Sequence, residues 1–345
     1  MNLEKLVPKC DPENQFDVLV NTFTQVEYAW ENDFDLSSLN NKKFNSVIVS
    51  GLGGSAISGD LMQNFLQNEL KIPYSVNRNY TLPSFIDKES LLIASSYSGN
   101  TEETLEVLNK AIEIGCSIVC ITTGGKMREI ANKKNLPLVL LKEGYQPRYS
   151  LGLSFFSLLK VLQKLNIISD QSDIVLKIQN QLKESGIEFA KENSTPYKIA
   201  EELIGFIPII YSVSDVTNAL GNRFKCQLNE NSKVHAFCNY YPELNHNEIV
   251  GWETVNFNLF NSKLINVLDE VYHPQVKKRF QISNDLISEK GVQTIELKSE
   301  LPTFKERLFY LVYLTDWISY YLAILRGQDP SEIDNIHALK KRLTE

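Results

Sequence analysis

Few residues of this chain are of the kinds that disulfides and metal sites require. Among 345 residues there are four histidines, and the five cysteines are Cys10, Cys116, Cys120, Cys226 and Cys238. No two cysteines have the two-residue spacing of zinc knuckles or redox pairs, and the histidines are scattered without His-x-x-x-His spacing. We therefore expect reduced thiols in a cytoplasmic protein and no metal ion.

Positive charge is also scarce, since 35 Lys and Arg residues face 42 Asp and Glu residues, a net charge of −7. The chain has no long basic run that would track a phosphate backbone or an anionic lipid surface. We therefore expect neither nucleic acid nor membrane as a partner. The first eight residues carry no basic region followed by an apolar core, so secretion is not indicated.

Long apolar runs are rare, and one segment is an exception. Residues 308–325 are nearly all apolar and about long enough to span a bilayer. Thr315 and Asp316 lie at the centre of this segment, and a central Asp costs roughly 2.5 to 3.5 kcal/mol on membrane insertion. We predict instead a buried helix in a protein core or a subunit interface.

The rest of the chain alternates between strand-like and helical segments. Strands are expected at 46–49, 90–94, 116–121, 138–141, 207–211, 263–267 and 292–297, and long helices at 14–31, 151–165, 173–193 and 304–325. Because parallel strands need crossover helices, the pattern predicts an α/β fold with mostly parallel, doubly wound sheets. The length fits two domains, 1–150 and 151–345, with the boundary where Gly144, Pro147 and Gly152 interrupt the pattern.

The turn after the first strand is rich in glycine. Gly51-x-Gly53-x-x-Ala56 is superficially a dinucleotide fingerprint, which needs an acid about 20 residues further on to bind ribose. Residues 72–86 contain no acid, and the next one is Asp87. We therefore expect no nicotinamide cofactor, and no other cofactor is indicated.

The loop after the second expected strand carries an unusual number of hydroxyl groups. Ser96, Ser98 and Thr101 lie together with Gly99 where a strand leads into a helix. Free backbone amides and the helix dipole favour an anion there, and hydroxyl groups suit a phosphate monoester. The alternative is simple N-capping, for which one hydroxyl group suffices. We favour phosphate.

Several motifs resemble one known family. The segment 96–104, SYSGNTEET, resembles the phosphosugar-binding loop of sugar isomerase (SIS) domains, and Gly54 and Ser55 in the turn 53–55, GGS, resemble the family's first loop. The segments 229–233, NENSK, and 242–248, PELNHNE, are similar to the signature of bifunctional phosphoglucose/phosphomannose isomerases. With QPR at 146–148 and IHALK at 336–340, the resemblance spans nearly the whole chain. It implies two SIS-like αβα sandwich domains.

The resemblance also implies catalytic roles. Glu230 would be the carboxylate base that carries a proton between C2 and C1, a task that a carboxylate can perform in both directions. From the residues alone, Glu243 and Glu248 are rivals for this role, and a solvated loop acid is the alternative for Glu230. His246 would open the sugar ring, in its own or in a neighbouring subunit, because imidazole titrates near neutrality.

Two cations complete the set that the resemblance implies. Lys340 would assist at the sugar ring, although Lys341 is not excluded and both also suit an ordinary helix C-terminus. Arg148 would stabilise negative charge on the enediolate, and pairing with Glu143 at the surface is the alternative.

The sequence therefore predicts a metal-free isomerase of phosphohexoses. It would interconvert glucose 6-phosphate, or mannose 6-phosphate, and fructose 6-phosphate through a cis-enediol, as a homodimer with a shared active site. Two alternatives remain: a non-catalytic SIS protein that binds sugar phosphates, and an SIS isomerase of another phosphosugar. The resemblance is imperfect, because Phe224 stands where the family has Trp and Ser232 where Ala is common.

Overall fold

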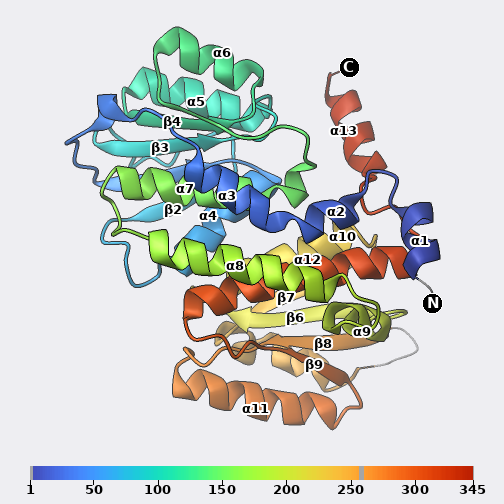
Figure 1. The fold of residues 1–345 in the computed structure, drawn as a ribbon. Coiled ribbons are helices and arrows are strands. Elements are labelled where there is room, and N and C mark those ends of the chain that lie inside the picture. The colour runs from blue at the N-terminus through green and yellow to red at the C-terminus, as the bar shows by residue number, and fades with distance from the viewer. Residues whose placement is uncertain (1–2, 256–259, 345) are drawn as a thin grey trace. The chain divides into compact units, whose positions relative to one another are not determined.

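The computed structural model describes residues 3–255 and 260–344 (Figure 1). The chain forms two compact units, one of Asn21–Asn180 and one of Met1–Val20 with Gln181–Glu345. The helices are α1 (Leu3–Cys10), α2 (Gln15–Val20), α3 (Thr22–Glu31), α4 (Gly53–Phe65), α5 (Glu102–Ile114), α6 (Gly125–Lys134), α7 (Leu151–Lys164), α8 (Ser172–Phe189), α9 (Thr195–Glu202), α10 (Asn218–Glu230), α11 (Pro274–Ser288), α12 (Phe304–Leu325) and α13 (Asp334–Thr344), with 3-10 helices η1 (Ser37–Leu39), η2 (Pro147–Tyr149), η3 (Glu243–His246) and η4 (Glu248–Trp252). The division falls within α8, and the boundary near residue 150 stays a prediction.

The unit of residues 21–180 is built on a five-stranded parallel sheet. Its order is β2-β1-β3-β4-β5, with strands β1 (Ser46–Ser50), β2 (Tyr74–Asn77), β3 (Ser90–Ser95), β4 (Ser117–Thr122) and β5 (Leu138–Leu140). Alternate side chains serve opposite faces. Ile48 and Leu92 pack in one core cluster with Val107 of α5 and Met127 of α6. On the other face, Gly59 lets α4 approach Val49 closely.

The other unit contains a four-stranded parallel sheet in the order β7-β6-β8-β9. Its strands are β6 (Ile207–Val213), β7 (Phe237–Tyr241), β8 (Ser262–Val267) and β9 (Gln293–Leu297). Ile209 and Leu264 pack with Phe280 and Ile287 of α11 in one core cluster. Helices α10 and α12 lie on the opposite side of this sheet, so both faces are covered (Figure 1). Both units confirm the predicted α/β class with parallel sheets.

Helix α12 is a core helix. Its most apolar 18-residue window is 94% buried, and in the described part of the chain it is the one helix long and apolar enough to cross a membrane. The hydroxyl group of Tyr313 donates to the Leu19 carbonyl oxygen at 2.6 Å, and that of Tyr320 donates to Asp11 at 2.8 Å. The prediction of a buried helix is confirmed, and of the two settings expected for it, the helix occupies the protein core.

Two parts of the sequence-based prediction differ from the structure. The single helix expected at 14–31 is broken at Asn21, between α2 and α3. Strands β2 and β7, and helices α1 and α9, were not predicted. Both missed strands are edge strands of their sheets, and β2 is half-buried throughout.

Candidate active site

The loop after β3 brings its hydroxyl groups together. The Oγ of Ser96 lies 2.8 Å from the Oγ1 of Thr101 and accepts a hydrogen bond from the Gly99 amide at 3.1 Å. Ser98 is exposed, and its Oγ accepts a hydrogen bond from the Asn100 amide at 3.3 Å. Thr101 immediately precedes α5, yet its side chain makes no capping hydrogen bond to the helix. Simple N-capping therefore does not explain this hydroxyl group.

Two further segments reach the same edge of the first sheet. A Cβ atom on Gly51 would lie 2.7 Å from the Ser95 carbonyl oxygen, and one on Gly54 would lie 2.6 Å from the Pro147 carbonyl oxygen. The turn that leads into α4 therefore contacts the end of β3 on one side and the segment of Arg148 on the other. Both glycines are needed because any side chain there would push these segments apart.

Ser55 and Arg148 are both held inside this group of segments. Ser55 is 8% exposed in the first turn of α4, and Arg148 is 5% exposed with its guanidinium 5.6 Å from the centre of the Tyr149 ring. This burial disfavours a solvated surface pair between Arg148 and Glu143. Two helix N-termini and several hydroxyl groups thus meet at one edge, with the backbone of Arg148 beside them, an arrangement suited to a phosphate group.

The conformation of the loop after β3 depends on Gly99. Its φ is +68°, and a Cβ atom there would lie 1.9 Å from the Gly124 carbonyl oxygen. Gly99→Ala is therefore expected to displace the loop and weaken the binding of inorganic phosphate at least tenfold, as measured by titration calorimetry. The matched control is Gly115→Ala, because Gly115 has a φ of +79° with no atom within 4 Å. That control should lose about 1 to 2 kcal/mol of unfolding free energy and keep its phosphate affinity; equal affinities in the two variants would contradict the assignment.

Glu230 is the last residue of α10, and the chain after it is firmly anchored. Asn231 and Ser232 are fully buried. The side-chain Nδ2 of Asn231 donates to the Ser319 hydroxyl group at 2.9 Å, and the Ser232 hydroxyl group donates to the Ser319 carbonyl oxygen at 2.7 Å. Ser232, a departure from the family pattern, thus joins α10 to α12. Glu230 itself is half-buried, on a backbone that these contacts hold in place.

His246 ends η3 and is exposed. The asparagines on either side of it hold the loop. Asn245 donates to the Ser283 hydroxyl group at 2.8 Å, and the Asn247 side chain accepts from the Glu248 amide at 2.6 Å and donates to Glu243 at 3.0 Å. The imidazole is therefore exposed on a loop whose neighbouring asparagines are hydrogen-bonded within the protein.

Glu248, a rival for the role of base, is part of a partly buried network. It accepts hydrogen bonds from the Tyr211 hydroxyl group at 2.7 Å and from Asn239, and Trp252 donates to the same Tyr211 oxygen at 2.7 Å. Burial and the neighbouring Glu248 carboxylate raise the pKa of Tyr211 well above its usual value. Tyr211 therefore remains a donor to Glu248, whose oxygens are committed to holding η4.

Lys340 and Lys341 are both exposed on α13, so burial does not choose between them. Phe224, the other departure from the family pattern, is fully buried. Ser319, which anchors the chain after Glu230, lies far away in the sequence, and no local signal could have revealed it. Across residues 3–255 and 260–344, no group of three or more His, Cys, Asp or Glu side chains is placed to hold a metal ion.

Comparison with known proteins relates both halves of this chain to sugar isomerase domains. The model of the SIS domain matches residues 38–142, and that of the bacterial phospho-glucose isomerase C-terminal SIS domain matches residues 192–343. A bifunctional phosphoglucose/phosphomannose isomerase of Caldicellulosiruptor bescii is 38% identical, covering 96% of this chain and 99% of that protein. A D-glucosamine-6-phosphate 4-epimerase of Sulfolobus acidocaldarius is 32% identical, covering 77% and 87%.

A solved structure supports the fold independently. The C-terminal domain of glucosamine-fructose-6-phosphate aminotransferase from Francisella tularensis superposes with a TM-score of 0.67 at 19% identity, covering 92% of this chain and 96% of that one. At this identity the likeness concerns the fold alone, which is that of two SIS domains. The sequence relationship extends over nearly the full length, and on that basis the chain belongs to the family of bifunctional phosphoglucose/phosphomannose isomerases.

Proposed function

We propose that the protein interconverts glucose 6-phosphate and fructose 6-phosphate, and mannose 6-phosphate and fructose 6-phosphate. The observation that carries this proposal is the match to a bifunctional enzyme over 96% of the chain at 38% identity. The grouping of hydroxyl groups, helix N-termini and Arg148 at one sheet edge supports it, because a phosphosugar needs an anion site. The reaction class is aldose–ketose isomerisation.

The phosphate group of the substrate would bind the loop after β3. Ser96, Ser98 and Thr101 would donate hydroxyl hydrogen bonds, and the start of α4 at Gly54 and Ser55 would add backbone amides. Binding of this kind needs no basic surface, which agrees with a chain of net charge −7. Arg148 would stabilise the negative charge that develops on the enediolate oxygen.

Glu230 would transfer the proton. Its carboxylate takes the proton from C2 of the open-chain aldose, and the electron pair of that C–H bond forms the enediolate. The same carboxyl group then returns the proton to C1, while the hydroxyl proton of O2 passes to O1. These two transfers yield the ketose and regenerate the carboxylate. Because C2 is planar in the enediolate, the glucose and mannose epimers converge on one intermediate, and one base serves both.

His246 and Lys340 would act at the sugar ring. His246 would give a proton to the ring oxygen as the pyranose opens, with Lys340 assisting. We further propose a homodimer in which His246 completes the site of its own or the neighbouring subunit. The exposed apolar side chains of Phe237 and Val250, 52% and 57% exposed, lie next to this loop in sequence and support an interface there. The five free thiols support a cytoplasmic location.

The test is a turnover assay with purified protein in EDTA. Fructose 6-phosphate is supplied, and glucose 6-phosphate and mannose 6-phosphate are each quantified by a coupled dehydrogenase. We expect both products. No turnover to either aldose would overturn the isomerase and leave a non-catalytic sugar-phosphate-binding protein. If glucose 6-phosphate forms but mannose 6-phosphate does not, the isomerase activity stands and only the dual specificity is refuted.

The epimerase relative gives the alternative of another phosphosugar a concrete form. Its printed activity is a 4-epimerisation of glucosamine 6-phosphate, at 32% identity to this chain. Incubating the protein with glucosamine 6-phosphate and following the C4 proton by NMR distinguishes the two reactions. We expect no change at C4; inversion there without aldose formation from fructose 6-phosphate would favour the alternative.

A further inference from the structure

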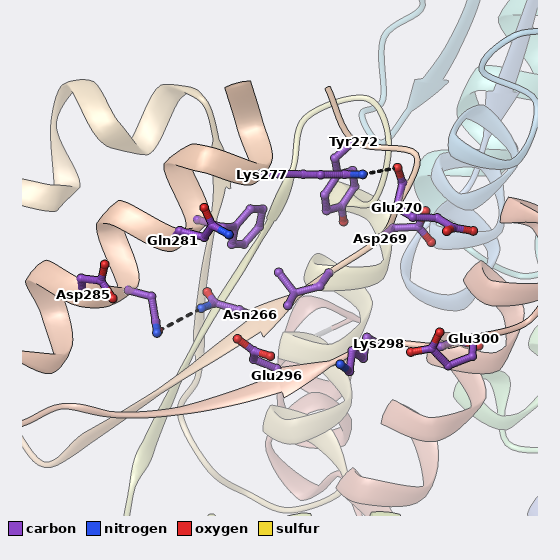
Figure 2. A pocket seen from close by; sticks show the side chains of 14 residues that line it. Asn266, Asp269, Glu270, Tyr272, Lys277, Gln281, Asp285, Glu296, Lys298 and Glu300 are labelled. Atoms are coloured by element: carbon purple, nitrogen blue, oxygen red, sulfur yellow. Dashed lines mark hydrogen bonds between the residues drawn. The ribbon is translucent and has the colours of Figure 1, made fainter. Parts of the chain in front are cut away.

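A cavity of about 640 Å³ lies in the unit of residues 181–345, between α11 and the β8 and β9 strands (Figure 2). None of the residues to which the proposed reaction assigns a role lines it. Its wall comes from the ends of β8 and β9, from the loops that follow them and from α11. We propose that this cavity binds a linear aliphatic polyamine, a chain of methylene groups that carries two or more ammonium groups.

The first support is a hydrogen-bond acceptor that lacks a donor. Asn266 lines the cavity and is 2% exposed, and its Oδ1 has no hydrogen-bond partner among the described residues. Its amide nitrogen is engaged with Asn284 of α11 at 3.4 Å. A buried carbonyl oxygen without a donor costs about 1 to 3 kcal/mol, so a ligand with N–H groups would relieve that cost.

The second support is the charge of the wall. Five carboxylates line the cavity against two lysines. Asp269 is already paired with Arg307, which donates to both its oxygens at 2.8 and 2.9 Å, and Lys277 donates to the Glu270 carbonyl oxygen at 2.6 Å (Figure 2). Arg307 also pairs with Glu270 at 2.8 Å, which leaves Asp285, Glu296 and Glu300 against the two lysines. This small excess of negative charge disfavours a phosphate ligand. An ammonium group, which has three donors and no acceptor, fits it.

The pairing of β8 with β9 places the Glu296 carboxylate beside the unpaired side-chain oxygen of Asn266. Glu296 of β9 is the direct partner of Asn266 of β8 in the parallel ladder, and both side chains project toward α11. Asp285 faces the same space from α11 (Figure 2). The acceptors are spread along the cavity, and no three acidic, Cys or His side chains in the described part of the chain converge as a metal site would require. Spread acceptors suit a long cation.

The third support is the apolar part of the wall. Leu268, Tyr272 and Phe280 line the cavity, and the two rings are parallel with centres 5.9 Å apart. The Tyr272 hydroxyl group is used within the protein, at 2.6 Å from Thr217 and 3.2 Å from the Val267 carbonyl oxygen. The rings therefore offer carbon surface, which matches the methylene segments between ammonium groups.

Topology explains why a ligand site should be found here. The sheet orders β2-β1-β3-β4 and β7-β6-β8-β9 correspond, so the loops after β8 and β9 occupy the place that the loops after β3 and β4 hold in the other unit. Ligands of open parallel sheets bind at the carboxyl ends of the strands. Where the first sheet has hydroxyl groups that suit an anion, the second has carboxylates and an amide oxygen that suit a cation.

The test is titration calorimetry of the full chain with spermidine at low salt. We expect one spermidine per chain, with affinity that falls as NaCl is added because the carboxylates are partly solvated. Glu296→Gln should weaken binding roughly tenfold, the effect of losing one hydrogen bond to a charged group. The matched control is Glu289→Gln, since Glu289 is exposed just after α11 and outside the cavity wall. Asn266→Leu should weaken binding as Glu296→Gln does.

Three results would overturn the proposal. These are the absence of stoichiometric spermidine binding, equal affinities in Glu296→Gln and Glu289→Gln, and a MgCl2 titration that depends on Glu296 in the same way. Binding is read as heat rather than as turnover, so the outcome is independent of whether the protein is an isomerase.

Discussion

Replacing Glu230 by Gln is expected to lower kcat for both aldose products by roughly 10²- to 10⁴-fold. The amide keeps the size and hydrogen-bonding reach of the side chain but cannot carry a proton between C2 and C1. Stability should stay the same or rise, because a carboxylate at the C-terminus of α10 opposes the helix dipole by about 0.3 to 1 kcal/mol. The Glu230 carboxylate lowers the stability of its helix, yet its backbone is held firmly in place. A catalytic role would account for both features.

The measurement that separates chemistry from binding is isotope exchange. In D2O, the wild-type protein should exchange the C2 proton of glucose 6-phosphate, and Glu230→Gln should not, while its KM changes little. The matched control is Glu243→Gln, an exposed acid of η3, which should keep activity within a few-fold. Full activity in Glu230→Gln would move the role of the base to Glu243 or Glu248.

Replacing Asp316 by Leu is expected to lower the unfolding free energy by about 3 to 5 kcal/mol. Asp316 lies in the middle of α12, 8% exposed, and accepts from Arg223 at 3.0 and 2.8 Å and from Gln227 at 3.0 Å. Its removal would leave the Arg223 guanidinium, itself 3% exposed, buried without its carboxylate. Urea unfolding followed by the fluorescence of the neighbouring Trp317 measures the loss.

The two partners of this pair should not be equivalent. Burial raises the pKa of Asp316, and Arg223 acts against that rise. In Arg223→Met the carboxyl group can take up a proton, whereas the guanidinium left by Asp316→Leu cannot lose one. Because the folded-state pKa would then lie above the unfolded value, the penalty in Arg223→Met should appear as pH rises and fade toward pH 4. The penalty in Asp316→Leu should not change with pH in this way.

A double variant completes the comparison. Arg223→Met with Asp316→Leu should be much more stable than Asp316→Leu alone, because it leaves no buried charge. Losses below 1 kcal/mol in both single variants, or the same pH dependence in both, would contradict the assigned role of the pair.

Sequence reasoning found all five strands that have neighbours on both sides, and two of the four edge strands, β5 and β9. Strands β1, β3, β6 and β8 are almost entirely buried, so they appear as continuous apolar runs. The missed strands β2 and β7 are the corresponding edges of the two sheets, where one side of the strand and part of its side chains face solvent. Sequence periodicity reflects burial, and strands as exposed as β2 and β7 give no clear periodic signal.

The candidate site was predictable where a motif is continuous in sequence. The serine loop, the glycine turn and the Asn-rich segment around His246 are all local, and each was identified. The anchoring of Glu230 by Ser319 and the pairing of Asp316 with Arg223 were not, because they join residues about 90 positions apart. Asp316 was noted as a polar break in an apolar run, but its partner depends on how α10 packs on α12. The cavity beneath α11 depends in the same way on strand register.

The hydrogen bonds from Tyr320 to Asp11 and from Tyr313 to Leu19 span 309 and 294 residues. They also determine which parts of the protein can fold first during synthesis. Residues 21–180 form a continuous unit that can fold while the ribosome is still extending the chain, whereas α1 and α2 must wait until α12 has emerged. Helices α1 and α2 are therefore synthesised first, but they pack into the core that forms last. The most apolar helix emerges when α9 and α10, its packing partners, have already been made.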